Sequence, residues 1–351
     1  MDAATDFATR LDRHLAQVSR RRGPLGTPQV AVRASGLGID YRFGPTTLPF
    51  HAASVGKLVT AALVMQLCEA GAVRAGTLVA EVLPAAELHG LFLPGEQVTL
   101  EHLLTHTSGA ADYFDGKVSS GLRVSKEAVA DPNRFWTPED LLTVSRKRQV
   151  PVGRPGEQFH YSDTGYLLLG RVLEVVTGET FHDLVHRRVV TPLGLQRTFL
   201  PFRSSPARGS TDLAPMYLGR TEISRFRSLT CDWAGGGIAS TPDDLLLLSA
   251  ALHDGELIAP ESLALLARPR HRFRPGLDYG AGLMTVRFEG FAPWLRGQPR
   301  LLGHIGVTAT HVFHDPVHGA EIALNFASTR EMTRSFRTLF EVARLLGRAA
   351  S

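Results

Sequence analysis

Residues 51–71, HAASVGKLVTAALVMQLCEAG, constrain the fold more than any other stretch of the chain. Lys57 is the only charged side chain in this stretch before Glu69, and nearly all the residues after it are apolar, on every side of a helix. A helix without a polar face is normally buried. The stretch therefore predicts a central helix from about Ser54 to Ala70 that carries a lysine into the protein core.

Strand patterns lie near both ends of the chain, and helical patterns lie between them. The predicted strands are Gln29 to Ala34, Gly38 to Phe43, Gly282 to Phe288, Arg300 to His304, Thr308 to Phe313 and Glu321 to Ala327. The predicted helices between and after them include Leu100 to Leu104, Pro138 to Arg148, Asp163 to Thr177, Phe181 to Val189, Leu245 to His253 and Arg330 to Leu346.

This order predicts an α+β fold, in which an antiparallel sheet is built from both termini, is flanked by helices and carries an inserted, mainly helical domain. Residues 1–70 and 231–351 are expected to form the sheet domain, and residues 71–230 the inserted one.

The composition is that of a globular protein and excludes several classes of function. Of the 351 residues, 44% are hydrophobic and 21% are charged, and two cysteines are too few for a disulfide framework. The formal net charge of +4 comes from scattered arginines without a nucleic-acid-binding motif, so we expect no nucleic-acid partner. No apolar run is long enough for a membrane span, and the first 22 residues lack the apolar core of a signal peptide. A cytoplasmic location is the expectation.

Ser54 and Lys57 form a candidate catalytic pair. A spacing of three residues places both side chains on one side of a helix, and a hydroxyl at a helix N-terminus lies in a field that favours negative charge. An amine among apolar groups loses hydration, which favours its neutral form, and a neutral amine can accept a proton from serine. The spacing alone leaves two ordinary structural roles open: Ser54 could cap the helix N-terminus, and the Lys57 side chain could extend to solvent.

Two later motifs supply companions for this pair. Tyr161 and Asp163 come just before another apolar helix, and a phenol near a lysine can relay a proton; packing and helix capping are the alternatives. In His304-Ile305-Gly306, the glycine lets a ligand approach the backbone, so the amides of Val307 and Ser54 could form an oxyanion hole. The alternative here is an ordinary connection between strands.

Together these motifs resemble the β-lactamase-related serine hydrolases, the group of class C β-lactamases, D,D-peptidases and related esterases. The matching motifs are Ser54-Val55-Gly56-Lys57, Tyr161-Ser162-Asp163 and His304-Ile305-Gly306. PGEQVTLEHLLTHTSGAADYF from Pro94 and AGGGIASTPDDLLLLSAAL from Ala234 also match the group's pattern. The resemblance spans roughly residues 50–327. It implies the same fold, with the site between a sheet and a helical domain.

The resemblance also implies a role for each residue. Ser54 would be the acylated nucleophile, Lys57 its proton partner, and Tyr161 the base or acid shared by acylation and deacylation. His304 would take the position of the cation in the third motif, where many members carry lysine and esterase-like ones often carry histidine.

Three residues depart from the group's usual pattern. Asp163 replaces an asparagine, and an ionised carboxylate there would favour the charged form of Lys57, which would then hold Tyr161 as a phenolate or strong hydrogen-bond acceptor. Ile305 replaces a small hydroxyl residue and Val307 a glycine. Recognition of the carboxylate of a β-lactam or a D-Ala-D-Ala peptide is therefore less expected than that of an ester, or of an amide without a free carboxylate.

The sequence predicts a serine hydrolase that acts on a small ester or amide through an acyl-enzyme on Ser54, without a cofactor. An acyltransferase that passes the acyl group to an amine or alcohol is an alternative, because the same motifs serve both reactions. A non-catalytic binding protein with a retained pocket is another. Three irregular loops, 112–136, 201–227 and 268–279, are predicted to set specificity. The oligomeric state is not predicted.

A zinc enzyme is a rival interpretation that the sequence disfavours. The histidine pairs and clusters that suggest it are His102 with His106, His182 with His186, and His311 with His314 and His318. No HExxH motif occurs, and the first pair lies in the segment that resembles the serine hydrolases. We expect these histidines to be structural and no metal to be bound.

Overall fold

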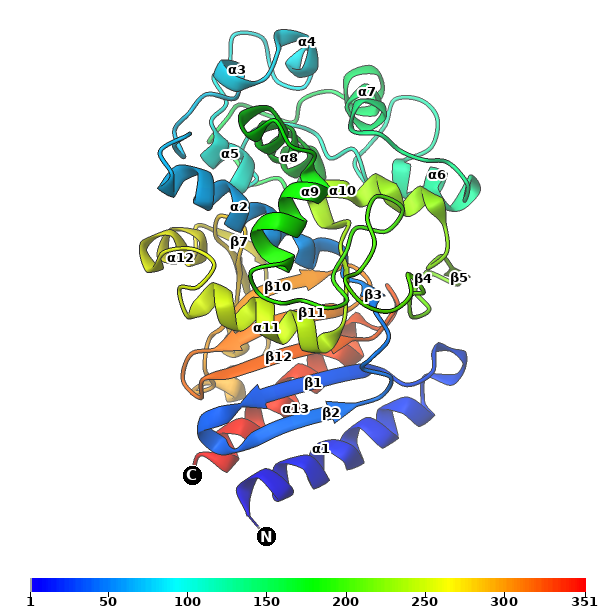
Figure 1. The fold of residues 1–351 in the computed structure, drawn as a ribbon, viewed down its shortest axis with the longest axis vertical. Helices are drawn as coiled ribbons and strands as arrows, with labels where there is room; N and C mark the ends of the chain where they lie inside the picture. Colours follow the sequence, from blue (N-terminus) through cyan, green and yellow to red (C-terminus); the bar gives the residue numbers. More distant parts are fainter. Residues whose placement is uncertain (1) are drawn as a thin grey trace.

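The computed structural model describes residues 2–351, apart from the side chain of Pro24, and centres on one eight-stranded sheet (Figure 1). All neighbouring strands of this sheet are antiparallel, and the first strand of the chain pairs with the last, from Gln29 opposite Asn325 to Arg33 opposite Glu321. The prediction of an α+β fold with an antiparallel sheet built from both termini is confirmed. In sheet order the strands are β2 (Ile39–Phe43), β1 (Gln29–Ala34), β12 (Ala320–Asn325), β11 (Thr310–Asp315), β10 (Leu301–Gly306), β9 (Met284–Val286), β8 (Leu277–Tyr279) and β7 (His271–Arg274).

Helices cover both faces of the sheet, because alternate strand residues point to opposite sides. Val30 and Val32 pack in the hydrophobic cluster of α1 (Ala3–Arg20) and α13 (Met332–Ala349), whereas Ala31 packs on the other face, in the cluster of α2 and α11. The helices α1 and α13 contact each other beside the two chain ends, which lie close together in Figure 1.

The remaining helices lie mainly above the sheet in the view of Figure 1. They are α2 (Lys57–Glu69), α3 (Val79–Val82), α4 (Ala85–Leu88), α5 (Leu100–Leu104), α6 (Val124–Ala130), α7 (Pro138–Arg148), α8 (Asp163–Thr177), α9 (Phe181–Val185), α10 (Trp233–Gly236), α11 (Pro242–His253) and α12 (Pro260–Ala267). Two small antiparallel pairs join β3 (Phe50–His51) to the distant β6 (Ala239–Ser240), and β4 (Tyr217–Leu218) to β5 (Thr221–Glu222) in a hairpin.

Several local predictions need correction. Residues 112–136 and 201–227, predicted as irregular loops, contain α6 and the β4–β5 pair. Residues 268–279, also predicted as a loop, contain the short strands β7 and β8, and the charged residues of β7 at the sheet edge hide the strand pattern. The central helix is shorter than predicted. Ser54 lies in a 3₁₀ turn (Ala53–Gly56), and the α-helix begins at Lys57.

The larger hydrophobic cluster contains residues from both predicted domains, such as Leu63 of α2 and Leu168 of α8. The division into residues 1–70 with 231–351 and residues 71–230 stays a prediction. Among residues 2–351, no helix combines the length and hydropathy that crossing a bilayer requires.

Candidate active site

The turn that carries Ser54 is held in a tight backbone arrangement. Ala53 has a φ of 50°, a conformation that costs an alanine free energy and that is found preferentially at functional sites. The turn packs so closely on neighbouring backbone that two glycines are required. A Cβ at Gly236 would lie 2.6 Å from the carbonyl of Ala53, and one at Gly306 would lie 2.7 Å from the oxygen of Ala52. The serine turn is thus packed between Gly236 of α10 and Gly306 of β10.

Lys57 is fully buried, and its amine points to Ser54 rather than to solvent. The Nζ atom lies 3.2 Å from the Ser54 hydroxyl oxygen and donates a hydrogen bond of 2.5 Å to the carbonyl of Gly235. It also forms an ion pair with the carboxylate of Asp163, at the start of α8. The structure therefore brings three of the predicted site residues together.

The charge on Lys57 differs from what burial alone predicts. Burial lowers the pKa of the amine, but the carboxylate of Asp163, followed by Tyr161 and Asp232, more than offsets this and raises the pKa of Lys57 above its ordinary value. The expectation of a neutral lysine that takes the serine proton is not supported. The geometry instead favours the other hypothesis, in which Lys57 stays charged because of Asp163.

Two further carboxyl groups surround this ion pair, and the sequence analysis missed both. Asp112 accepts hydrogen bonds from the backbone amides of Asp163, Phe114 and Asp115, at 3.0–3.1 Å. Asp232 lies 3.8 Å from His51. Burial, and then repulsion from Asp163, raises the pKa of Asp112 and of Asp232 to about 7. Asp112 lies in the segment from Pro94 that matches the group's pattern, but the sequence does not indicate that the fold brings it and Asp232 close to Asp163.

Tyr161 lies beside this network, in a cluster of aromatic rings. Its ring centroid is 5.0 Å from Lys57 Nζ and 4.2 Å from the ring of His106. Burial raises the pKa of Tyr161 to about 12, and the charge of Lys57 opposes this rise. His106 accepts a hydrogen bond from the amide of Ser162 (3.1 Å), and its other nitrogen lies 3.0 Å from the Tyr279 hydroxyl. His106 is thus a positioning residue for the tyrosine segment, a role that the sequence analysis did not assign.

The surroundings of His304 disfavour the charged form that the resemblance implies. Its side chain is fully buried, and burial, with a smaller effect from Lys57, lowers the pKa of the imidazole to about 3. Its Nδ1 atom lies 2.9 Å from the backbone of Ile305, and its Nε2 atom has no hydrogen-bond partner among the described residues. A neutral imidazole beside a charged lysine is the stable arrangement, since a second cation in this buried place would be repelled.

Ser54 and Tyr161 open onto a cavity of about 200 Å³. Gly306 and Val307 line it next to Ser54, in the region where the oxyanion hole is predicted. The other lining residues are mostly apolar: Phe273, Arg274, Leu277, Met284, Ile305, Met332 and Phe336. Of the three loops predicted to set specificity, only 268–279 contributes to this lining; within the described part of the chain, 112–136 and 201–227 do not.

Most of the histidines behind the zinc interpretation have local structural partners. The hydrogen-bonded pairs are His102 with Thr99, His182 with Thr180, His186 with Thr191, His311 with Ser335, and His318 with Asp315. His253, His314 and Glu321 place potential ligand atoms within 4.8 Å of one another. Because His314 lies near the end of β11 remote from Thr310, which pairs with Gly306 at the serine cavity, this group is not part of the Ser54 site.

The coupling between Asp163 and Lys57 gives a testable pH dependence. In Asp163→Asn, the group that raises the lysine pKa is lost, so burial should lower that pKa toward neutrality. If charged Lys57 is needed, kcat/KM should fall on the alkaline side between about pH 7 and pH 10 in the variant, and not in the wild type. Initial rates across this range provide the measurement. Identical profiles for the two proteins would exclude the coupling.

Comparison with known proteins places the chain in a family. The sequence profile described as Beta-lactamase matches residues 42–347. Penicillin-binding protein 4 of Amycolatopsis lactamdurans is 36% identical over 152 residues, which cover 42% of this chain and 35% of that protein. Esterase EstB of Burkholderia gladioli is 28% identical, with 92% of this chain and 91% of the esterase covered. The chain spans about half or less of the length of three curated penicillin-binding proteins it matches, with 51% and 54% for two from Bacillus subtilis strain 168.

Solved structures show the same fold. The D-amino acid amidase from Ochrobactrum anthropi SV3 complexed with D-phenylalanine superposes with a TM-score of 0.79 at 21% identity, covering 98% of this chain and 99% of the amidase. EstCE1, a hydrolase with promiscuous acyltransferase activity, superposes with a TM-score of 0.74 at 20% identity, covering 98% of this chain and 99% of its own. With the family profile matching most of its length, this chain belongs to the β-lactamase family of serine hydrolases.

Proposed function

We propose that the chain is a serine hydrolase that forms an acyl-enzyme on Ser54 and acts on a small ester or amide. The observation that carries the proposal is the contact of 3.2 Å between the Ser54 hydroxyl and a fully buried amine, next to a tyrosine and facing a cavity. A serine becomes an effective nucleophile when neighbouring groups remove its proton and stabilise the developing charge. The related esterase EstB and the structurally similar amidase are consistent with this reaction class.

The charges of the site suggest how the proton moves. Charged Lys57 cannot accept the proton of Ser54. It does lower the free energy of a phenolate at Tyr161, and this phenolate can accept the proton. Ser54 attacks the carbonyl carbon as its proton passes to Tyr161. Tyr161 then returns the proton to the leaving oxygen or nitrogen. Water repeats the sequence on the acyl-enzyme, with Tyr161 again as the base.

The lining of the cavity favours an apolar group beside the scissile bond. Arg274 is the one charged residue among those that line the cavity within the described chain, and most of the others are apolar. Each buried CH₂ group contributes about 0.8 kcal/mol, so two of them correspond to about a 15-fold preference. A neutral substrate with a short acyl chain or an aromatic ring is therefore proposed over a β-lactam or a carboxylate-bearing peptide.

This preference can be measured with p-nitrophenyl esters. We expect kcat/KM for the butyrate to exceed that for the acetate by about 10-fold in the wild type. Phe273→Ala, which removes part of the apolar wall, should reduce this ratio several-fold, whereas Phe202→Ala, at an exposed position outside the cavity lining, should not. Faster turnover of a penicillin than of either ester would contradict the proposed substrate class.

Acyl transfer is the second candidate, and the apolar cavity favours it because excluding water slows hydrolysis of an acyl-enzyme. The structural similarity to EstCE1 is consistent with such an activity. Product analysis of p-nitrophenyl butyrate turnover with added benzyl alcohol or a primary amine separates the two. Butyrate as the main product, with an unchanged rate, indicates a hydrolase. An acylated acceptor and a rate that rises with its concentration indicate a transferase.

A further inference from the structure

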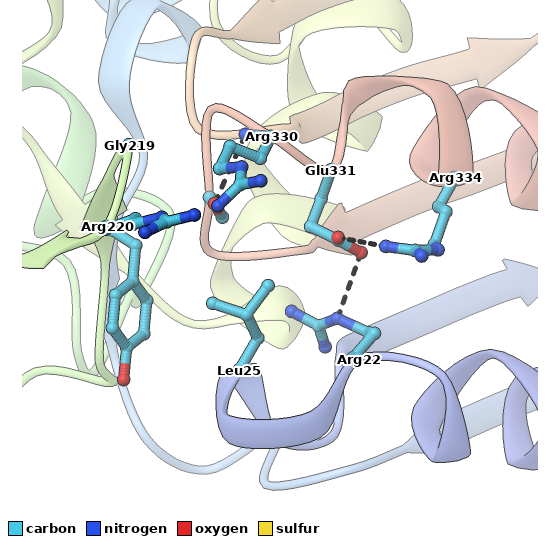
Figure 2. A pocket seen from close by; sticks show the side chains of 9 residues that line it. Arg22, Leu25, Gly219, Arg220, Arg330, Glu331 and Arg334 are labelled. Carbon is cyan, nitrogen blue, oxygen red and sulfur yellow. Dashed lines mark hydrogen bonds and ion pairs between the residues drawn. The ribbon is translucent and has the colours of Figure 1, made fainter.

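A second and larger pocket, of about 610 Å³, carries an excess of positive charge (Figure 2). Four arginines and one glutamate are the charged residues among those that line it: Arg22, Arg220, Arg330, Arg334 and Glu331. It is formed where the β4–β5 hairpin meets the loop between β12 and α13.

Glu331 neutralises only two of these arginines. Its carboxylate is buried and forms ion pairs with Arg22, at 3.3 Å, and with Arg334. Arg22 also donates hydrogen bonds to the carbonyls of Gly26 and Phe326. These two arginines are therefore structural parts of the pocket wall.

Arg220 and Arg330 make no ion pair with any residue between positions 2 and 351. In Figure 2 their guanidinium groups extend into the same space, toward each other. Two like charges that face each other repel. Each guanidinium group can donate a pair of hydrogen bonds to the oxygen atoms of a tetrahedral oxyanion.

Hydrogen bonds join the two chain segments that carry Arg220 and Arg330. The β4–β5 hairpin, with Arg220 in its turn, is fixed to the loop before α13 by three hydrogen bonds. They are donated by Tyr217 to Ala327 (2.8 Å), by Thr329 to Tyr217 (3.1 Å) and by Gly219 to the hydroxyl of Thr329 (2.9 Å). The backbone segments that carry Arg220 and Arg330 are thus fixed relative to each other, while both arginine side chains are exposed.

The same loop also reaches the serine cavity. Ser328, which lines the arginine pocket, donates a hydrogen bond of 2.8 Å to Thr308, the neighbour of Val307. Met332, which follows Glu331, lines the serine cavity. Residues 328–332 therefore contribute to the lining of both cavities.

We propose that the arginine pocket binds a small, soluble phosphate monoester, with the phosphoryl group between Arg220 and Arg330. A phosphate monoester carries close to two negative charges at neutral pH, which matches two unpaired guanidinium groups. The pocket volume leaves room for the rest of such a molecule beyond the phosphate. This binding does not depend on acylation of Ser54.

Calorimetry with glycerol 3-phosphate, at physiological ionic strength, tests the proposal. We expect saturable binding of one molecule per chain, and at least about 10-fold weaker binding by the double variant Arg220→Ala/Arg330→Ala. Neither side chain forms an ion pair with another described residue, so the double variant should unfold at the wild-type temperature. Ser54→Ala should bind like the wild type, which keeps this test separate from that of the hydrolase.

Arg13→Ala/Arg74→Ala is the matched control, because it also removes two positive charges, from exposed arginines outside the pocket lining. Equal loss of binding in this control would reduce the effect to net charge and overturn the proposal. Absence of saturable binding would overturn it as well. Binding to phosphatidylcholine vesicles that contain phosphatidic acid, without binding of glycerol 3-phosphate, would assign the pocket to a lipid surface and reject the soluble ligand.

Discussion

Ser54→Ala is expected to lower kcat/KM for p-nitrophenyl butyrate by at least about 10³-fold, because the proposed reaction passes through an acyl group on the Ser54 hydroxyl. The fold should survive the change, since Ser54 is only partly buried and the hydroxyl that is lost accepts a hydrogen bond from the Lys57 amine, which keeps its contacts to Asp163 and Gly235. The measurement is steady-state turnover together with the far-ultraviolet circular dichroism spectrum.

The matched control is Ser120→Ala, which removes an exposed serine hydroxyl that does not line the cavity. Its kcat/KM should equal that of the wild type. A folded Ser54→Ala protein with more than about a tenth of the wild-type rate would show that the nucleophile is elsewhere.

Lys57→Met is expected to impair both activity and stability. Methionine keeps the length and the apolar part of the side chain but removes the charge, so Tyr161 loses the group that stabilises its phenolate, and kcat/KM should fall by about 10³-fold or more. Removing one partner of a buried ion pair costs about 3–5 kcal/mol of unfolding free energy, because the other charge stays buried without compensation. Here the uncompensated group is the carboxylate of Asp163, with Asp112 and Asp232 close by.

The stability effect should depend on pH in a defined direction. A carboxyl group whose pKa is raised on folding binds its proton more tightly in the folded state. The raised pKa values of Asp112 and Asp232, about 7, therefore favour folding at acidic pH, and this contribution is lost as the pH rises from about 4 to about 7. Without Lys57 the carboxyl groups should take up protons still more readily. The loss of unfolding free energy in Lys57→Met, relative to the wild type, should accordingly be larger at about pH 8 than at about pH 5.

Urea unfolding at these two pH values measures the deficit, and Lys57→Met/Asp163→Asn is its control. The double variant removes both charges of the pair, so it should recover much of the lost stability while staying inactive. An equal deficit at both pH values, or no recovery in the double variant, would contradict the electrostatic account of this buried network.

The sequence predicts the main features of the fold because its patterns are local. The apolar helix after Lys57 and the alternating runs near both ends depend on neighbouring residues, and α5, α7 and α8 begin and end where predicted. The hairpin β7–β8 escapes prediction because its short strands carry charged residues at an exposed sheet edge. The 3₁₀ turn at Ser54 is missed for a different reason. It depends on close packing against Gly236 and Gly306, which are distant in the sequence.

The sequence predicts which residues form the candidate site where a motif marks them. It does not predict the charge of a site residue, because that charge depends on residues that only the fold brings close. The spacing of Ser54 and Lys57 and the tyrosine motif identify residues that the fold brings together. The charge of Lys57 could not be derived from the apolar helix alone, because Asp163 reverses the effect of burial. The neutral state of His304 likewise follows from its burial next to that lysine.

The most direct test of the central claim is the intact mass of the protein after exposure to a fluorophosphonate and, separately, after rapid quenching of p-nitrophenyl butyrate turnover. Formation of an acyl-enzyme on Ser54 predicts one phosphonyl group per wild-type chain with the first reagent and one butyryl group with the second, and no addition to Ser54→Ala. The same mass gain in Ser54→Ala as in the wild type would contradict the account.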